Sequence, residues 1–223
     1  MVYVLSSFTM SVTLPLIQKS NCCWTSRRFV CVMATFLICS LTARAQKKDY
    51  EISVAGIEIG SLTITRELKG DLTHYDLKSK VKLWLFFRIE AEYNMTAVYR
   101  GDQLISSKSQ THTNKGDFKS STEWDGHQYR VNIDAYEYKK DTLIAEPIHF
   151  NVGRMYFEKP VQGQKIYADN FGLLIPAVKN GDGIVVRILG NASTYHYKGN
   201  VMFDASMYHP LKNYRVKIVS GEQ

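Results

Sequence analysis

The sequence predicts an all-β, mainly antiparallel fold: a curved meander, half-barrel or barrel with a short helical or irregular crossover. Apolar and polar residues alternate over long stretches, which is typical of strands with one face in a core and one in water. Turn signals recur about every ten residues, and helical periodicity is nearly absent. Roughly nine or more strands of this kind bury their apolar faces by curling around a shared interior.

The first 45 residues differ from the rest of the chain. They hold all four cysteines and no Asp or Glu. An Arg-Arg pair at 27–28 precedes an apolar run at 29–41, and Ala-Arg-Ala follows at 43–45. These features predict a signal peptide at 1–45 that is cleaved after Ala45, with a retained N-terminal membrane anchor as the alternative. The expected location is therefore the periplasm or the exterior of the cell.

The expected mature chain, residues 46–223, is a single antiparallel β domain. It has no cysteine, so packing alone must hold it together. Four of the 28 Lys and Arg residues and none of the 21 Asp and Glu residues precede it, so its formal net charge is +3 (24 against 21) rather than +7. This balance argues against a nucleic-acid partner. The sequence allows membrane contact and leaves the oligomeric state open, and no transmembrane segment is expected after processing.

The clearest strand is predicted at 87–99, where odd-numbered residues are apolar and most even-numbered residues are polar. The same alternation runs upstream from Tyr75. The chain is expected to turn near 83–86, because a single strand of roughly 27 residues is implausible. Two strands precede it, at 50–54 and 57–64, and a switch of parity at Gly60-Ser61 predicts a β-bulge in the second.

Turn signals divide the remaining chain into further strands. The expected turns lie at 100–102, 114–117, 125–126 and 139–141. Their spacing predicts an antiparallel meander, followed by four closing strands. The expected strands are 103–113, 117–124, 128–138, 184–189, 193–198, 200–204 and 213–219.

Residues 152–178 interrupt the alternation and are predicted to form the crossover. A short helical turn is expected at 152–158, ending before Pro160, and a brief strand at 164–169. The run 171–176 is apolar on all sides, so protein or ligand must cover it. We expect a structural plug on the open face of the sheet. A mobile lid over a ligand cavity and a catalytic loop are the alternatives.

The alternating apolar positions of the predicted strands are rich in aromatic residues. Ordinary core packing is one explanation. The other explanation is a concave apolar surface that binds an apolar ligand. The candidate ligand-binding residues are Trp84, Phe87, Tyr93, Trp124, Phe171 and Leu174.

The sequence shows no motif for catalysis or metal binding. Its six histidines lack HxxxH or HExxH spacing, and GxSxG and P-loop patterns do not occur. Glu90 and Glu92 share a strand face and could form a carboxylate pair, but a solvated face interleaved with Arg88 explains them better. The sequence therefore predicts no enzyme activity, no catalytic residue, no metal and no cofactor.

Several stretches resemble a bacterial family of exported proteins with no assigned function. The resemblance covers nearly all of 46–223 and is carried by structural rather than catalytic motifs. More remotely, the strand pattern is similar to the periplasmic lipoprotein-carrier fold, an open half-barrel whose concave side is plugged by a helical element. That likeness would make 152–178 the plug, and it does not fix function. The resembling stretches are YEISVAGIEIGSLTITRE (50–67), VYRGDQLISSKSQTHTNKGD (98–117), MYFEKP (155–160) and YHYKGNVMFD (195–204).

Two functions are expected from these observations. The first is an exported cell-envelope protein that binds or carries an apolar ligand, such as a lipid or another apolar small molecule, without catalysis. The second is a structural or protein-interaction module of the envelope, with a filled core and no ligand.

Overall fold

The computed structural model describes residues 45–84, 88–114, 116–135, 138–208 and 212–221. The chain divides into two compact units, and every described residue belongs to the second unit, Ala43–Gln223. The predicted signal peptide, apart from Ala45, lies outside the described residues. Within the described ranges, no helix is long and apolar enough to cross a membrane.

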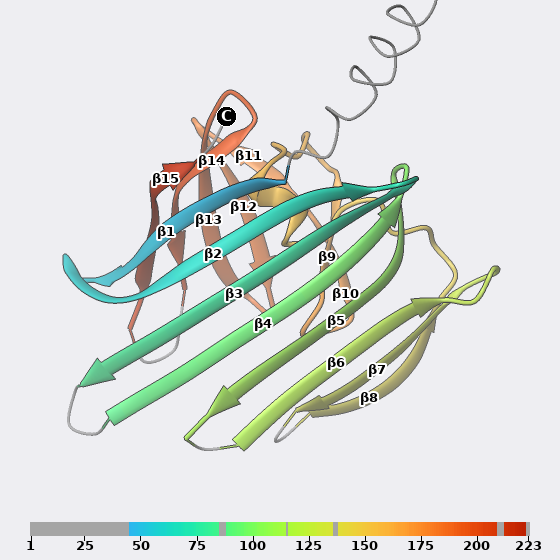
Figure 1. The fold of residues 1–223 in the computed structure, drawn as a ribbon, viewed down its shortest axis with the longest axis horizontal. Helices are drawn as coiled ribbons and strands as arrows, with labels where there is room; N and C mark the ends of the chain where they lie inside the picture. Colours follow the sequence, from blue (N-terminus) through green and yellow to red (C-terminus); the bar gives the residue numbers. More distant parts are fainter. Residues whose placement is uncertain (1–44, 85–87, 115, 136–137, 209–211, 222–223) are drawn as a thin grey trace, which may run out of the picture. The chain divides into compact units, whose positions relative to one another are not determined.

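One antiparallel sheet of thirteen strands forms this unit (Figure 1). β1 to β8 follow one another as a meander, and β11 to β15 continue the sheet on the other side of β1, where β15 pairs with β1. β8 and β11 are its two edges, so the sheet is open, and the all-β antiparallel prediction is confirmed. The strands are β1 (Gln46–Val54), β2 (Ile57–Lys69), β3 (Leu72–Trp84), β4 (Arg88–Arg100), β5 (Gln103–Thr113), β6 (Gly116–Trp124), β7 (Tyr129–Ala135), β8 (Tyr138–Ile144), β11 (Val178–Asn180), β12 (Gly183–Ile188), β13 (Asn191–Lys198), β14 (Val201–Met207) and β15 (Tyr214–Gly221).

The hairpin connections alternate between two ends of the sheet, because neighbouring strands are antiparallel. We call the end with the connections β1–β2, β3–β4, β12–β13 and β14–β15 the lower end. The connections β2–β3, β4–β5, β6–β7 and β13–β14 lie at the opposite, upper end (Figure 1).

The bulge predicted at Gly60-Ser61 lies one residue earlier, at Ile59, where the register of β1 and β2 shifts. Gly60 itself faces β3. A Cβ at this position would lie 2.1 Å from the backbone oxygen of Lys80, so only glycine fits between the two strands. The parity switch in the sequence therefore reflects a real irregularity of this strand pair.

One predicted turn is wrong. Residues 139–141 lie inside β8, and β7 ends at Ala135 rather than at residue 138. β8 is an edge strand, where an exposed lysine such as Lys139 discourages pairing with another chain, and Lys140 donates to the carbonyl oxygen of Gly172 in the crossover. A charged stretch is therefore compatible with a strand here. The short edge strand β11 had no strand signal in the sequence.

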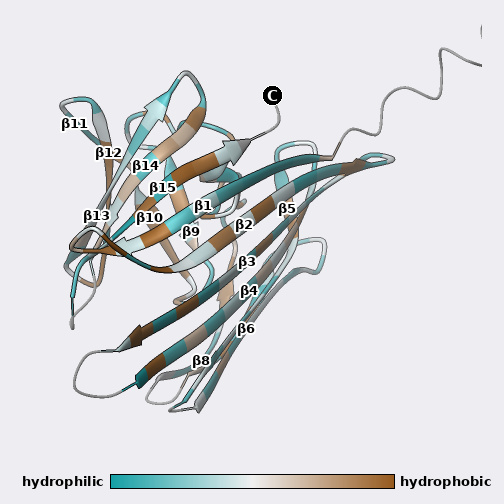
Figure 2. Cartoon of the chain, turned by 60° about the vertical axis from the view of Figure 1, so that its left-hand side comes forward, coloured by the Kyte–Doolittle hydropathy of each residue, from teal (hydrophilic) through white to brown (hydrophobic). Residues whose placement is uncertain are grey.

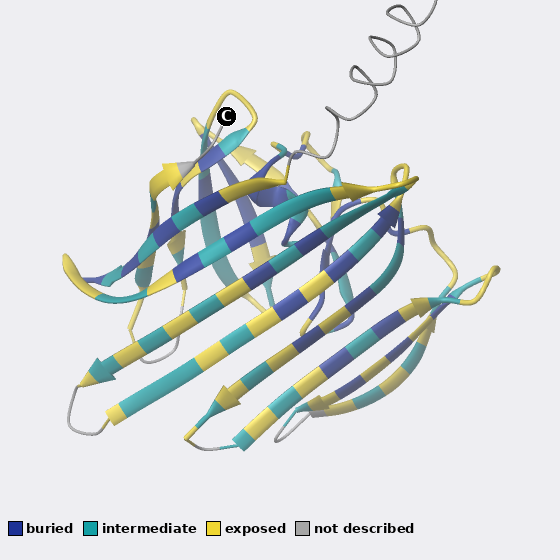
Figure 3. Ribbon diagram, in the orientation of Figure 1, coloured by how far each residue is buried: buried dark blue, intermediate teal, exposed yellow. Residues whose placement is uncertain are grey.

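Buried and exposed residues alternate along many of the strands (Figure 3), so the core lies on one face of the sheet, which we call the inner face. In β4, burial alternates residue by residue from Ala91 to Tyr99, which confirms the predicted parity over this part of the strand, whereas Ile89, Glu90 and Ala91 are all half-buried. Burial also changes along the strand. Inner-face residues of β4 are buried toward the upper end (Met95, Ala97 and Tyr99) and half-buried toward the lower end (Ile89, Ala91 and Tyr93).

The crossover, residues 145–177, connects β8 to β11. It contains a short 3-10 helix, η1 (Arg154–Tyr156), and a hairpin of β9 (Lys165–Ala168) and β10 (Leu173–Pro176). The predicted helical turn and brief strand are thus confirmed.

Parts of the sheet that are distant in sequence cover the crossover. The ring of Tyr156 meets that of Tyr50 on β1 edge-on, with 5.2 Å between centroids. Gly172 lies so close to β7 that a Cβ there would be 2.9 Å from Cγ1 of Val131. Neighbouring protein covers the run 171–176 only in part: Gly172 and Ile175 are buried, Phe171, Leu173 and Leu174 are half-buried, and Pro176 is exposed.

Candidate functional site

A buried carboxylate ties the crossover to the sheet. Asp169 directly follows β9 and is 2% exposed. The hydroxyl of Ser107, on β5, donates a hydrogen bond to it. The side-chain amide of Asn151 donates to both carboxylate oxygens, at 3.2 and 3.3 Å, and the backbone N–H of Val152 donates as well. These donors compensate the removal of the carboxylate from water.

Two further crossover residues bond to the same strands. The hydroxyl of Ser109 on β5 donates to Oδ1 of Asn170 at 2.5 Å and lies 2.7 Å from the hydroxyl of Ser120 on β6. The hydroxyls of Tyr167 and Thr122 are 2.6 Å apart. Hydrogen bonds between crossover and sheet thus run across two neighbouring strands.

Small hydroxyl side chains on β5 and β6 form the receiving surface for these residues. All four are buried on the inner face: Ser107, Ser109, Ser120 and Thr122. A side chain of leucine size at these positions would occupy the space that Asp169 and Asn170 fill. The sequence alone does not distinguish these residues from ordinary serines and threonines of a strand, so this cluster was not predicted. The sequence did contain one signal that could have revealed this cluster: two polar residues, Asp169 and Asn170, directly follow an apolar strand inside the crossover.

Burial raises the pKa of Asp169 above its ordinary value of 3.8, although hydrogen bonds from Ser107 and Asn151 act in the opposite direction. A carboxyl whose pKa is higher in the folded than in the unfolded chain takes up its proton first in the folded chain. Its stabilising contribution is fully present below the unfolded pKa and is lost as pH rises through the folded pKa.

Acidification is therefore expected to favour the folded state through Asp169. Urea unfolding of the wild type and of Asp169→Asn, which cannot titrate at this position, measures the effect. The wild type should gain stability relative to the variant as the pH falls from about 7 to about 4. A stability difference that stays constant over this range would contradict a raised pKa.

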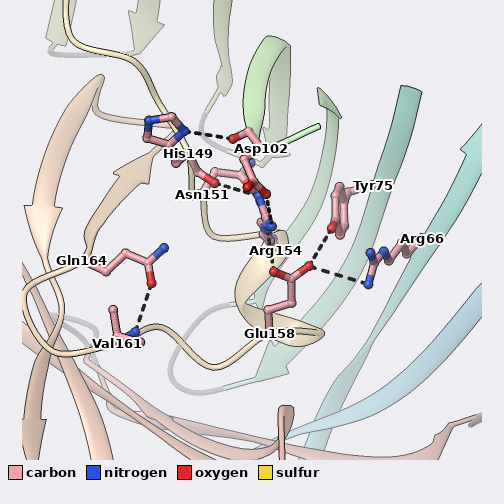
Figure 4. Close-up of polar contacts among 9 residues, drawn as sticks. All are labelled: Arg66, Tyr75, Asp102, His149, Asn151, Arg154, Glu158, Val161 and Gln164. Carbon is pink, nitrogen blue, oxygen red and sulfur yellow. Dashed lines mark hydrogen bonds and ion pairs between the residues drawn. The ribbon is translucent and has the colours of Figure 1, made fainter. Parts of the chain in front are cut away.

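A second polar cluster lies near the upper end, around η1 (Figure 4). The guanidinium of Arg154 donates to Glu158 at 2.8 Å, to Asp102 at 2.9 Å and to the carbonyl oxygen of His149 at 3.0 Å. The hydroxyl of Tyr75 donates to Glu158 at 3.3 Å. The bond from Arg154 lowers the pKa of Asp102, and burial raises the pKa of Tyr75 to about 12.

A cavity of about 330 Å³ adjoins this cluster. Arg154 lies over the rings of Tyr99 and Phe150, 5.4 Å from each centroid, and its donors are directed at protein oxygens. Each of its three guanidinium nitrogens therefore already donates to the protein, which disfavours a bidentate grip on an incoming carboxylate or phosphate. The cluster fastens η1 to the β4–β5 turn, and Asp102 of the Arg-Gly-Asp turn is one of its members.

The lower part of the inner face is different on β3 and β4, because it carries apolar side chains that are only half-buried. Val81 and Tyr93 pack against the core from its margin. Leu83 and Ile89 pair across β3 and β4 one step further toward the lower end, and both are half-buried. Figure 2 shows hydrophobic bands at the lower ends of these two strands. An apolar surface therefore continues past the crossover.

Two of the predicted ligand-binding residues lie on the inner face, at separate places. Tyr93 borders the half-buried lower region. Trp124 ends β6 at the upper end, where its ring packs on that of Tyr129 with 4.7 Å between centroids. Phe171 and Leu174 belong to the crossover and are half-buried against the core. The structure does not bring these four residues into one pocket.

Trp84 lies on the other face of the sheet. It neighbours the half-buried inner residue Leu83, pairs with the exposed Arg88 and is 75% exposed. Its position follows from the pleat, because consecutive residues of a strand point to opposite faces. Phe87 lies outside the described residues.

The carboxylate pair singled out in the sequence lies in solvent. Glu90 pairs with Arg88 at 2.5 Å, and Glu92 pairs with Lys80 at 2.9 Å, as expected for a solvated strand face. Among the residues that the structure describes, no group of His, Cys, Asp and Glu is placed to hold a metal ion.

Residues 50–218 match a family described as a domain of unknown function, DUF6134. The chain belongs to this family. The DUF6134 match runs from β1 to β15 and so includes the whole crossover, which confirms the predicted membership of a family without assigned function. A crystal structure of a β-barrel-like protein of another domain of unknown function, DUF1849 from Brucella abortus, is similar to 81% of this chain and 97% of that chain, with 12% identity and a TM-score of 0.47. No curated protein sequence matches the chain.

Proposed function

We propose that this DUF6134 chain is an exported, non-catalytic binding protein of the cell envelope. The proposed ligand is apolar, such as a lipid, and its site is the lower half of the inner face, around Leu83 and Ile89. One observation carries the proposal: the apolar parity of β3 and β4 continues for several residues beyond the region that the crossover covers.

Half-buried apolar side chains on a curved sheet are costly to leave in water, at about 25 cal/mol for each Å². Val81, Leu83 and Ile89 lie on neighbouring strands in one patch. Contiguous patches of this kind commonly serve for interaction. An apolar ligand that covers the patch would recover this free energy.

The crossover sets the upper limit of the site. The Tyr93 hydroxyl bonds to Ser109 and Asn170, so this ring closes the gap between crossover and sheet from below. A ligand would therefore lie between this ring and the lower end. The expected export of the chain rests on the Arg-Arg pair, apolar run and Ala-Arg-Ala site before residue 46.

The alternative is a structural or protein-interaction module whose inner face takes no ligand. Two variants of β4 distinguish these functions, because each adds one carboxylate on a different face. Ile89→Glu places it on the inner patch, and Asn94→Glu places it on the exposed outer face. Binding of a fluorescent fatty-acid probe to the unit Ala43–Gln223 is the measurement.

The wild type and Asn94→Glu are expected to bind the probe alike, and Ile89→Glu should bind it at least about tenfold more weakly. Organic extraction of the purified proteins should release a lipid from the wild type and from Asn94→Glu, but not from Ile89→Glu. Probe binding that Ile89→Glu leaves unchanged, or a wild type that binds no probe, would favour the alternative.

A further inference from the structure

The hairpin turns at the two ends of the sheet differ in chemical character. The upper hairpin turns are polar and glycine-rich: Gly70-Asp71, Gly101-Asp102, Asp125-Gly126 and Gly199-Asn200. Four lower hairpins, β12–β13, β14–β15, β1–β2 and β3–β4, instead expose a large apolar or aromatic side chain. Their connections follow from the antiparallel strand order, so all of them lie at the same end.

Four consecutive hairpins of the sheet each present one such side chain. The order β12-β13-β14-β15-β1-β2-β3-β4 places these hairpins side by side along the lower end. We call the four residues the lower rim. They are Leu189 (68% exposed), Tyr208 (43%), Ile57 (70%) and Trp84 (75%).

Leu189 is exposed at a conformational cost. Its φ is +49°, and Gly190 next to it has a φ of +86°, a pair of left-handed residues as in a tight hairpin turn. Asn, Asp or Gly is favoured at the first position of such a turn, and a bulky residue with positive φ is uncommon. Leu189 is too exposed to contribute to the core. Neither local conformation nor core packing therefore accounts for leucine at this position.

The spacing of the lower rim favours a flat partner. Single side chains on four separate turns are spread along the end of the sheet, so a broad surface suits them better than a partner that fills one narrow groove. Trp and Tyr are enriched where proteins meet the membrane–water interface, because their rings are amphipathic. Two of the four rim residues are of these types.

The charges beside Trp84 indicate the type of membrane. Lys78, Lys80, Lys82 and Arg88 are exposed on the same hairpin, against Glu90 and Glu92, which leaves an excess of two positive charges. Basic residues near a membrane surface are attracted to anionic lipids.

We propose that the lower rim docks this domain on the surface of an anionic lipid bilayer, with Trp84, Leu189, Ile57 and Tyr208 inserted at the level of the headgroups. This contact is separate from the ligand site, because Trp84 lies on the outer face and Leu189 on another hairpin. It would hold even if the inner face took no ligand.

Vesicle co-flotation of the unit Ala43–Gln223 tests the proposal. The vesicles contain equal parts of phosphatidylglycerol and phosphatidylcholine, or phosphatidylcholine alone. The wild type should float with the anionic vesicles and bind the neutral ones at least about fivefold more weakly. The double variant Trp84→Gln/Leu189→Asn should lose at least about tenfold in partitioning onto anionic vesicles.

The variants separate docking from folding. Asn tolerates positive φ, so Leu189→Asn should unfold at the same or a higher temperature than the wild type while binding vesicles less. Leu68→Asn is the matched control, because Leu68 is 52% exposed but near the upper end, and it should bind like the wild type. A wild type that ignores anionic vesicles, a double variant that binds like it, or an equal loss in Leu68→Asn would overturn the proposal.

Discussion

Replacing Asp169 with alanine is expected to lower the free energy of unfolding by about 3–5 kcal/mol. The substitution removes the acceptor shared by Ser107, Asn151 and the N–H of Val152, and it leaves these donors buried without their partner. A buried polar group that loses its partner costs more than the bond itself contributed. Urea unfolding followed by tryptophan fluorescence measures the change.

Asp169→Asn is the matched control for this prediction. It keeps the size of the side chain and one acceptor oxygen, so it should cost clearly less than the alanine variant. Serine at position 107 can rotate its hydroxyl to suit an amide. If Asp169→Ala lost less than about 1 kcal/mol, the carboxylate would not be what fastens the crossover to β5.

Replacing Tyr156 with alanine is expected to cost a similar amount, about 3–5 kcal/mol. Tyr156 is 2% exposed in η1 and stacks edge-on against Tyr50 of β1. It therefore joins the crossover to the strand at which the two halves of the sheet meet. Removing the ring leaves a cavity that neighbouring strands, held by their ladders, cannot close fully.

Tyr208→Ala serves as the control, because this tyrosine is 43% exposed at the lower end, and its unfolding free energy should stay within about 0.5 kcal/mol of the wild type. Thermal and urea unfolding of both variants give the comparison. Equal small losses in the two variants would mean that the crossover rests on the sheet without supporting it.

The strands were predictable because their side chains alternate between core and water. β4 keeps this alternation for most of its length, and its bounds differ from the predicted 87–99 by one residue at each end. β8 was missed for the same reason, since an edge strand carries charged residues that resemble a turn. The position of β15 beside β1 could not be predicted, because it depends on pairing between the two ends of the described chain.

The candidate site was harder to predict than the fold. Trp84 was grouped with the inner aromatic residues although its parity is that of the polar ones, and the structure places it outside. Asp169 and its partners were not predicted, because their role depends on contacts between residues that are far apart in sequence. Ser107 and Asp169, for example, are separated by 62 positions. The packing of the crossover against the core was predictable, since 171–176 could not face water on every side.

Amide hydrogen exchange across residues 161–175 tests the central claim most directly: the crossover is a fixed part of the core, so only the lower inner face stays open. The N–H of Tyr167 donates to the carbonyl oxygen of Phe150 at 2.7 Å inside this segment. The expected result is protection at Tyr167 and its neighbours in β9 equal to that of Met95 and its neighbours in β4. Exchange as fast as that of an exposed loop would instead make the crossover a mobile lid and contradict the account.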